Sequence, residues 1–198
     1  MTAKNRGKAS KVHDVYPSPL RLVRTAFDFL AEHHGPWLST VRSVLEPGAY
    51  SGAFCWGAEL YCNDLETIVG VELAPPEKRL VPYRLIRKNF KIWKTWERFD
   101  LIATNPPFTW ANDFIRKSVK LLTPRGRCLF LMRIGVLAGI ERFKIWHEEV
   151  NLQEVWVCVR RPGFKGDRST DASEYAFFLF DGNTKQSSQE VKVRWLWW

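Results

Sequence analysis

The sequence predicts an α/β fold in which a mostly parallel sheet is covered by helices on both faces. Short apolar runs rich in β-branched and aromatic residues alternate with stretches whose apolar residues recur at helical spacing. A chain of 198 residues has room for one domain with a full core. Sheets of this kind bind their ligands at the carboxyl ends of the strands. We therefore expect the chemistry in the turns that follow the strands.

The expected elements follow one another in chain order. Apolar residues at helical spacing from Leu20 to Leu30 predict a first helix, which should end at Gly35-Pro36. Thr123-Pro124 should end a later helix in the same way. We expect seven strands, at 41–45, 67–73, 83–87, 99–104, 127–134, 154–159 and 175–180, and helices at 20–33, 53–60, 110–122 and 136–149.

Two connections depart from a simple alternation. The segment 74–82 contains three prolines and cannot form a long helix, so the link to the third strand is short. The loop 160–174 is too short and too polar for a crossover helix, which makes the last strand antiparallel. We expect a basic arm over 1–15, a catalytic domain over 16–181, and a tail over 182–198 that can add a strand.

Composition limits the classes of function. Lys and Arg total 30 against 21 Asp and Glu, and the net charge of +9 favours a polyanionic partner. No run approaches the about 20 apolar residues of a membrane span, and the first residues lack an apolar signal core. A soluble cytoplasmic protein is expected. The cysteines form no CxxC pair, so we expect reduced core thiols and no metal site at Cys55, Cys62, Cys128 and Cys158.

A small-residue turn follows the first strand. The run from Glu46 to Phe54 reads EPGAYSGAF, and small residues let backbone N–H groups approach a ligand closely. It matches neither GxGxxG, a P-loop nor GxSxG, which disfavours dinucleotide, nucleoside-triphosphate and serine-hydrolase functions. Glu72 ends the second strand, where a carboxylate can accept hydrogen bonds from both hydroxyls of a ribose.

The strongest motif is Asn105-Pro106-Pro107-Phe108, directly after the strand FDLIAT. The two prolines fix φ and carry no N–H, so their carbonyl groups can point into a cleft. The Asn105 oxygen and a neighbouring carbonyl provide two acceptors for the hydrogens of a planar amino group. Phe108 offers a face on which the ring bearing that group can stack. The motif therefore predicts recognition of an exocyclic amino nitrogen.

With these motifs, residues 14–181 resemble the class I S-adenosylmethionine-dependent methyltransferases of amino nitrogens, most of all small phage-type N6-adenine DNA methyltransferases. The resemblance implies a Rossmann-like fold, S-adenosyl-L-methionine as cofactor and no metal. It also implies methyl transfer to adenine N6 in DNA, in the cytoplasm of a bacterial or phage-infected cell. The catalytic loop would be Asn105, Pro106, Pro107 and Phe108. Cofactor binding would fall to Tyr16, Ser18, Pro19, Glu46, Pro47, Gly48, Ala49, Tyr50, Gly52, Phe54, Glu72, Leu73, Asn89, Phe90 and Asn105.

Three features depart from the family. Tyr50 stands where glycine is usual, and a positive φ there would cost about 1–2 kcal/mol. An acid is commoner than Asn at position 89. The helix between the second and third strands is reduced to the proline-rich segment 74–82.

The basic residues suit a nucleic acid whose target base is flipped or unpaired, because a base inside a duplex cannot reach such a loop. With no separate recognition domain expected, we predict a short or relaxed recognition sequence. The nucleic-acid contacts are expected at Arg87, Lys88, Lys91, Lys94, Trp110, Arg160, Arg161, Lys165 and Arg168.

Several alternatives remain open. An amino nitrogen in RNA, adenine N6 or guanine N2, presents the same chemistry to the loop, as does a glutamine amide in a protein. The charge of +9 argues against the protein substrate. A nucleic-acid-binding protein that keeps the fold without catalysis is a further alternative. The chain could act as a monomer or a homodimer.

Overall fold

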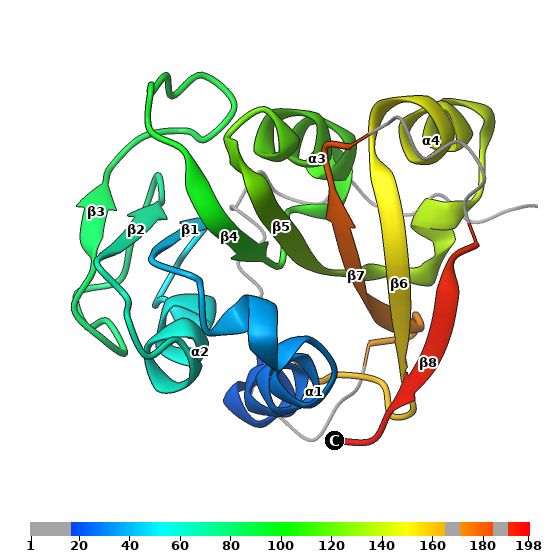
Figure 1. Ribbon diagram of the computed structural model, residues 1–198, viewed down its shortest axis with the longest axis horizontal. Helices are drawn as coiled ribbons and strands as arrows, with labels where there is room; N and C mark the ends of the chain where they lie inside the picture. Colours follow the sequence, from blue (N-terminus) through cyan, green and yellow to red (C-terminus); the bar gives the residue numbers. More distant parts are fainter. Residues whose placement is uncertain (1–16, 165–170, 184–189) are drawn as a thin grey trace, which may run out of the picture.

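The computed structural model describes residues 17–164, 171–183 and 190–198. The predicted arm 1–15 and the site candidates Tyr16, Lys165 and Arg168 lie outside these ranges. Eight strands form one sheet in the order β3-β2-β1-β4-β5-β7-β6-β8 (Figure 1). The strands are β1 Ser43–Pro47, β2 Thr67–Val71, β3 Arg84–Ile86, β4 Phe99–Thr104, β5 Leu122–Arg133, β6 Asn151–Cys158, β7 Tyr175–Asp181 and β8 Lys192–Leu196. The α-helices are α1 Leu20–Leu38, α2 Ala53–Tyr61, α3 Ala111–Val119 and α4 Ile140–Lys144.

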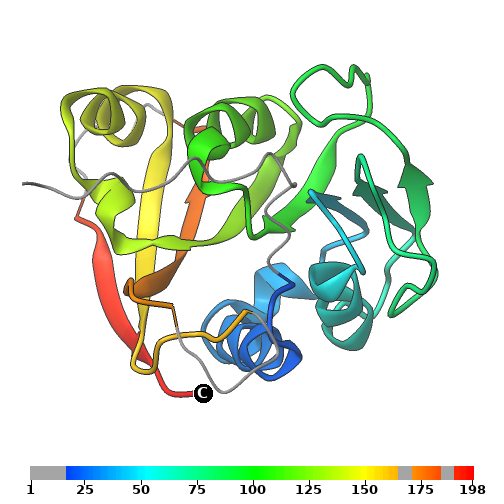
Figure 2. The same cartoon turned by 180° about the vertical axis from the view of Figure 1, so that it is seen from behind.

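The sheet has helices on both faces, as predicted. Helices α1 and α2 cover one face, and α3 and α4 cover the other (Figures 1 and 2). Strand β7 illustrates the two layers, because Phe177 and Leu179 belong to the core under α1 whereas Phe178 and Phe180 belong to the core under α3. The strand is antiparallel to both β5 and β6, which confirms the expected direction.

The regular part of the first helix ends at His34, directly before Gly35-Pro36, where its end was predicted. Helix α1 runs to Leu38 with a kink at His34, whose φ of −132° and ψ of 21° are not helical. The kink lets Pro36 stand near the start of a new turn, where its missing N–H costs no helical hydrogen bond. The prediction is confirmed for the regular helix, and the short helical turn that continues to Leu38 was not anticipated.

Thr123-Pro124 does not precede the fifth strand but lies inside it. Phe99 pairs with Leu122, whereas Leu101 pairs with Arg127, so β5 carries extra residues over this interval. A proline is tolerated in a strand at such an irregularity, because no ladder hydrogen bond is required of it there.

The helix predicted over 136–149 is divided into three short pieces. A 3₁₀ turn at Ile134–Leu137 precedes α4, and a π turn at Ile145–Glu149 follows it. Gly139 separates the first two with a φ of 105°, which is outside the helical region. The predicted continuous helix is therefore incorrect.

The tail adds an eighth strand to the seven expected. Strand β8 pairs in parallel with β6, from Glu154 opposite Lys192 to Cys158 opposite Leu196. Leu196 is buried, whereas Trp195 and Trp197 are largely exposed. The expected added strand is thus present.

The remaining predictions from composition concern the thiols and the membrane. All four cysteines are buried and unbridged, as expected of core thiols. Within the described ranges, no helix combines the length and apolarity that a membrane crossing requires.

Candidate active site

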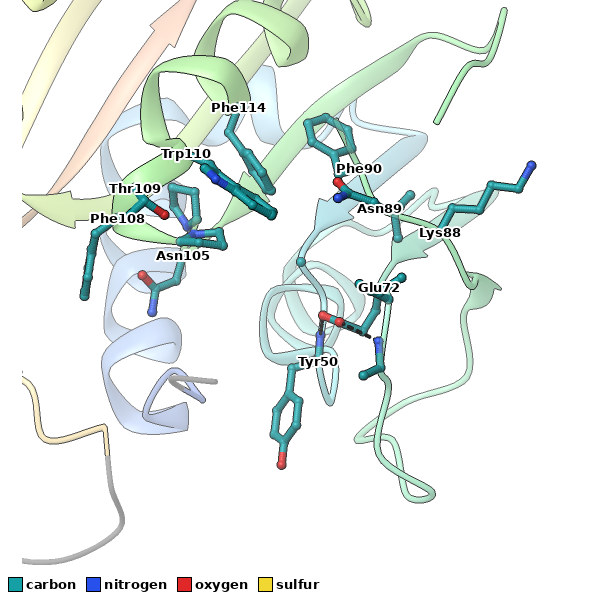
Figure 3. Close-up of a pocket in the computed structure, with 16 residues that line it drawn as sticks. Tyr50, Glu72, Lys88, Asn89, Phe90, Asn105, Phe108, Thr109, Trp110 and Phe114 are labelled. Carbon is teal, nitrogen blue, oxygen red and sulfur yellow. Dashed lines mark hydrogen bonds between the residues drawn. The ribbon is translucent and has the colours of Figure 1, made fainter. Parts of the chain in front are cut away.

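The carboxyl ends of β1, β2 and β4 meet at one edge of the sheet and enclose a cavity of about 300 Å³. The order of the strands changes direction here, since β1 lies between β2 and β4. Figure 3 shows the side chains that face this space. The predicted site residues that line it are Gly48, Tyr50, Glu72, Leu73, Lys88, Asn89, Phe90, Asn105, Pro106, Pro107, Phe108 and Trp110.

The turn after β1 has a left-handed backbone at three positions. Gly48, Tyr50 and Gly52 have φ angles of 67°, 43° and 84°. The positive φ considered at Tyr50 is therefore confirmed. Glycine adopts this region without a steric cost, but tyrosine does not, so the turn stores strain at Tyr50.

Glu72 fixes this turn through its carboxylate. Its Oε2 accepts a hydrogen bond of 3.0 Å from the backbone N–H of Tyr50, and its Oε1 accepts one of 2.9 Å from Ala74 (Figure 3). A carboxylate has about four acceptor positions, so each oxygen retains capacity for a further donor. Glu72 can therefore hold the turn and a pair of hydroxyl groups at the same time.

Glu46 lies behind the turn rather than on the cavity. It is buried, and its Oε2 accepts a hydrogen bond of 2.8 Å from the N–H of Cys55 at the start of α2. Burial raises the pKa of Glu46 to about 8. In this structure Glu46 therefore supports the start of α2 through Cys55, and its predicted contact with the cofactor stays a prediction.

Other predicted cofactor residues also lie off the cavity lining. Pro47, Ala49, Gly52 and Phe54 are buried within the turn and the first residues of α2. Ser18 and Pro19 precede α1, and the carbonyl oxygen of Pro19 accepts a hydrogen bond of 3.1 Å from the N–H of Val23. The lining as described contains none of these six.

The loop after β4 is joined to the turn after β1 by Thr104. Its buried hydroxyl donates a hydrogen bond of 2.5 Å to the carbonyl oxygen of Pro47. Beyond the loop, the N–H of Trp110 donates one of 2.9 Å to the carbonyl oxygen of Pro107. The side chains of Asn105 and Phe108 leave the loop in the same direction (Figure 3). Thr104 thereby sets the distance between the two halves of the site.

The far wall of the cavity is apolar. The rings of Phe90 and Phe114 lie 4.8 Å apart between centroids. The ammonium group of Lys117 lies 4.7 Å from the Phe90 centroid and donates hydrogen bonds to the backbone carbonyls of Phe90 and Trp93. Burial lowers the pKa of Lys117. Asn89 directly precedes Phe90 in the chain, and its Oδ1 accepts a hydrogen bond of 2.9 Å from the N–H of Lys91.

Sequence reasoning missed several of these residues. Phe114, Val71, Ala74 and Thr109 line the cavity without having been assigned to it. The helical register of α3, which places Phe114 one turn beyond Trp110, could have identified Phe114. Thr104 and Lys117 act through contacts between segments that are distant in the sequence, and no local pattern marks them.

The candidate nucleic-acid residues that the structure describes are exposed, but part of their charge is paired. Lys91 contacts Asp113 at 2.5 Å and lies 4.9 Å from the centroid of Trp110, while Arg161 contacts Glu174 at 2.5 Å. Within the described chain, the candidates without a carboxylate partner are Arg87, Lys88, Lys94 and Arg160. The described residues contain no group of three or more potential metal ligands.

Comparison with known proteins rests on structure alone. No protein-family model and no curated protein sequence matches the chain. A protein of Listeria monocytogenes assigned as a class I S-adenosylmethionine-dependent methyltransferase superposes with a TM-score of 0.63 at 12% identity, over 96% of this chain and 68% of that one. The M protein of the type I restriction enzyme EcoKI (EC 2.1.1.72) gives 0.61 at 17% identity, over 87% and 45%.

An RNA methyltransferase assigned in Pyrococcus horikoshii gives a TM-score of 0.56 at 14% identity, over 87% of this chain and 93% of that one. By contrast, the chain spans less than half the length of the EcoKI M protein. The chain has the Rossmann-like fold of class I S-adenosylmethionine-dependent methyltransferases.

Proposed function

We propose that this protein uses S-adenosyl-L-methionine to methylate the exocyclic N6 of adenine in DNA, with the target base flipped out of the duplex or unpaired. One observation carries the proposal. The Asn105–Phe108 loop, which suits a planar amino group, borders the same cavity as the Glu72 carboxylate, which suits a ribose.

The cavity fits the proposed cofactor in its chemistry. Glu72 has acceptor capacity toward ribose hydroxyls, and Phe90 and Phe114 offer an apolar wall to a planar base. The turn with positive φ at Gly48 and Tyr50 places both residues in the cavity lining, together with Asn105. When bound, S-adenosylmethionine supplies an electrophilic methyl carbon on a sulfonium centre.

The residues of the loop would activate the amino nitrogen without an acid or a base. Its lone pair is delocalised into the purine ring and becomes available as the nitrogen becomes pyramidal. The side-chain oxygen of Asn105 and the carbonyl oxygen of Pro106 would accept its two hydrogens and stabilise the positive charge that develops. Phe108 would hold the ring in line for the transfer. The leaving group is a neutral thioether that needs no proton, and the methylated nitrogen would release one of its two protons to solvent after the transfer.

The charge distribution supports a nucleic-acid substrate. Lys88 lines the cavity, and Arg87 and Lys94 are exposed on the same segment. A phosphate backbone would bind such cations, whereas a glutamine side chain would gain nothing from them. The similarity to the EcoKI M protein, which belongs to the adenine-specific DNA methyltransferase class, favours DNA. A short or relaxed recognition sequence remains part of the proposal.

RNA is the second candidate substrate. Adenine N6 or guanine N2 in RNA would meet the same two acceptors, and the fold is shared with an assigned RNA methyltransferase. A non-catalytic nucleic-acid-binding role would follow if Tyr50 prevented cofactor binding.

The test is incubation of the protein with S-adenosylmethionine and separate pools of DNA, RNA and protein, followed by digestion and mass analysis. We expect N6-methyladenine in DNA. Asn105→Ala should abolish transfer while leaving cofactor binding intact, and the matched control Asn63→Ala, an exposed residue beyond α2, should retain it. Methylated nucleosides in RNA alone would favour RNA as the substrate. Absence of both transfer and cofactor binding would select the non-catalytic role.

A further inference from the structure

The ring of Phe108, the proposed stacking partner of the target base, forms a cation–π contact with an arginine side chain in this structure. The guanidinium carbon of Arg133 lies 3.9 Å from the centroid of the Phe108 ring. Arg133 is the last residue of β5, the parallel neighbour of β4, so the two residues follow adjacent strands at the carboxyl edge. One face of the Phe108 ring is therefore covered by a residue of the neighbouring strand.

Arg133 is tethered on its other side. Its Nε donates a hydrogen bond of 3.2 Å to the hydroxyl of Tyr175, and its Nη2 contacts Oδ2 of Asp171 at 3.2 Å. The Tyr175 hydroxyl in turn donates to Asp171 at 3.0 Å, and the N–H of Ser173 donates to Oδ1 of Asp171 at 2.9 Å. Tyr175 is fully buried, whereas the Arg133 side chain is 40% exposed. The guanidinium group is thus held by two hydrogen bonds of 3.2 Å on one side, and the side chain remains partly open to solvent.

A guanidinium group and a purine are both planar, and each binds an aromatic ring by lying against its face. The two cannot occupy the same side of Phe108 together. A base that displaces Arg133 must gain at least as much stacking energy with Phe108 as the lost cation–π contact provided. A purine ring can do so, whereas a side-chain amide cannot. This arrangement would make Phe108 selective for a substrate with a ring.

We infer that Arg133 lies on Phe108 until the target base displaces it. The guanidinium group of Arg133 then pairs with a phosphate of the flipped nucleotide. The inference rests on the proposed function and deepens it by assigning a residue that contacts the flipped nucleotide. Tyr175 and Asp171 occupy two of the five N–H donors of the guanidinium group, and the others suit phosphate oxygens.

The test measures binding without cofactor. Two fluorescent single-stranded oligonucleotides of equal length, one of deoxyadenosine and one abasic, are titrated at several salt concentrations. The ratio of their dissociation constants reports the contribution of the base, and the salt dependence reports the number of phosphate contacts. Arg133→Ala is compared with Arg133→Lys and with Arg42→Ala. Arg42 is an exposed arginine that pairs with Glu66 and directly precedes β1, at the end of the sheet away from the cavity.

For Arg133→Ala we expect the contribution of the base to rise by about 3- to 30-fold, because no cation–π contact has to be broken. The slope of log K against log salt should shrink by about 0.7, the value of one phosphate on a single strand. Arg133→Lys should keep the wild-type slope, and Arg42→Ala should change neither quantity. A contribution of the base that falls or stays constant in Arg133→Ala, or an unchanged slope, would overturn the inference.

These outcomes are separable from the proposed function. A wild-type protein that prefers deoxyadenosine to the abasic strand but transfers no methyl group would refute the proposed reaction and leave the role of Arg133 intact. A methylating wild type whose Arg133→Ala variant binds both strands unchanged would refute the role of Arg133 alone. Thermal melting of each variant shows that the comparison is between folded proteins.

Discussion

The hydroxyl group of Tyr83 donates a hydrogen bond of 3.1 Å to the carbonyl oxygen of Tyr50. Tyr50 is the strained position of the turn after β1, with a φ of 43°. The Tyr83 ring also fills the space above Gly52 and Gly70, where an added Cβ would lie 2.5 Å and 2.3 Å from ring carbons. Burial raises the pKa of Tyr83, so the hydroxyl keeps its proton at neutral pH. Tyr83 therefore supports the proposed cofactor turn from behind.

Tyr83→Phe should test this support. The ring remains in place while the hydrogen bond is lost, so the free energy of unfolding should fall by about 0.5–1.5 kcal/mol. Cofactor affinity should fall severalfold, because the turn that presents the Tyr50 N–H to Glu72 would lose one of the hydrogen bonds that fix it. Urea denaturation and calorimetry measure the two effects. Tyr61→Phe, which removes a hydroxyl bonded to Asp28, is the matched control and should leave cofactor affinity unchanged.

The strain at Tyr50 leads to a second prediction. Tyr50→Ala removes the ring but keeps a side chain at positive φ, whereas Tyr50→Gly removes the strain as well. The glycine variant should therefore be more stable than the alanine variant by about 1 kcal/mol. Denaturant unfolding of the two variants measures the difference directly. Equal stability would mean that the turn relaxes around the side chain.

A third prediction concerns the close approach of Tyr83 to β2. In Gly70→Ala the new Cβ would lie 2.3 Å from a ring carbon of Tyr83 and 3.0 Å from the Cβ of Ala49. Overpacking of this kind should cost about 1–3 kcal/mol of stability and displace the turn. Gly135→Ala, with no atom within 4 Å of its new Cβ, should change stability by less than about 0.5 kcal/mol. Similar melting temperatures for both variants would contradict this packing.

The sequence predicted those parts of the site that depend on neighbours in the chain. Glu72 and the Asn105–Phe108 loop each directly follow a recognisable strand, and parallel strands bring their carboxyl ends together. A pattern of strands was therefore enough to place these groups at one edge. The strained φ at Tyr50 could likewise be anticipated, because the turn is local.

The contacts that hold the site together could not be predicted in this way. Tyr83 reaches Tyr50 across 33 residues, and Arg133 reaches Phe108 from the end of another strand. Such pairs depend on the register between strands, which the hydrophobic pattern does not specify to the residue. The prediction at Thr123-Pro124 was wrong for a related reason. A proline can end a helix and is also tolerated at a bulge, and the pairing with β4 decides between the two.

The buried carboxyl group of Glu46 leads to a prediction about pH. Its pKa is raised to about 8 by burial, against 4.5 for an ordinary glutamate. Between these values the folded protein holds a proton that the unfolded chain has released, so stability should fall as pH rises from 4.5 to 8. The slope is at most about 1.4 kcal/mol per pH unit. Glu46→Gln keeps an acceptor for the Cys55 N–H but cannot ionise, and should lose this slope in urea unfolding series. The exposed Glu59→Gln should keep it, and a wild-type slope in Glu46→Gln would assign the pH dependence to another group.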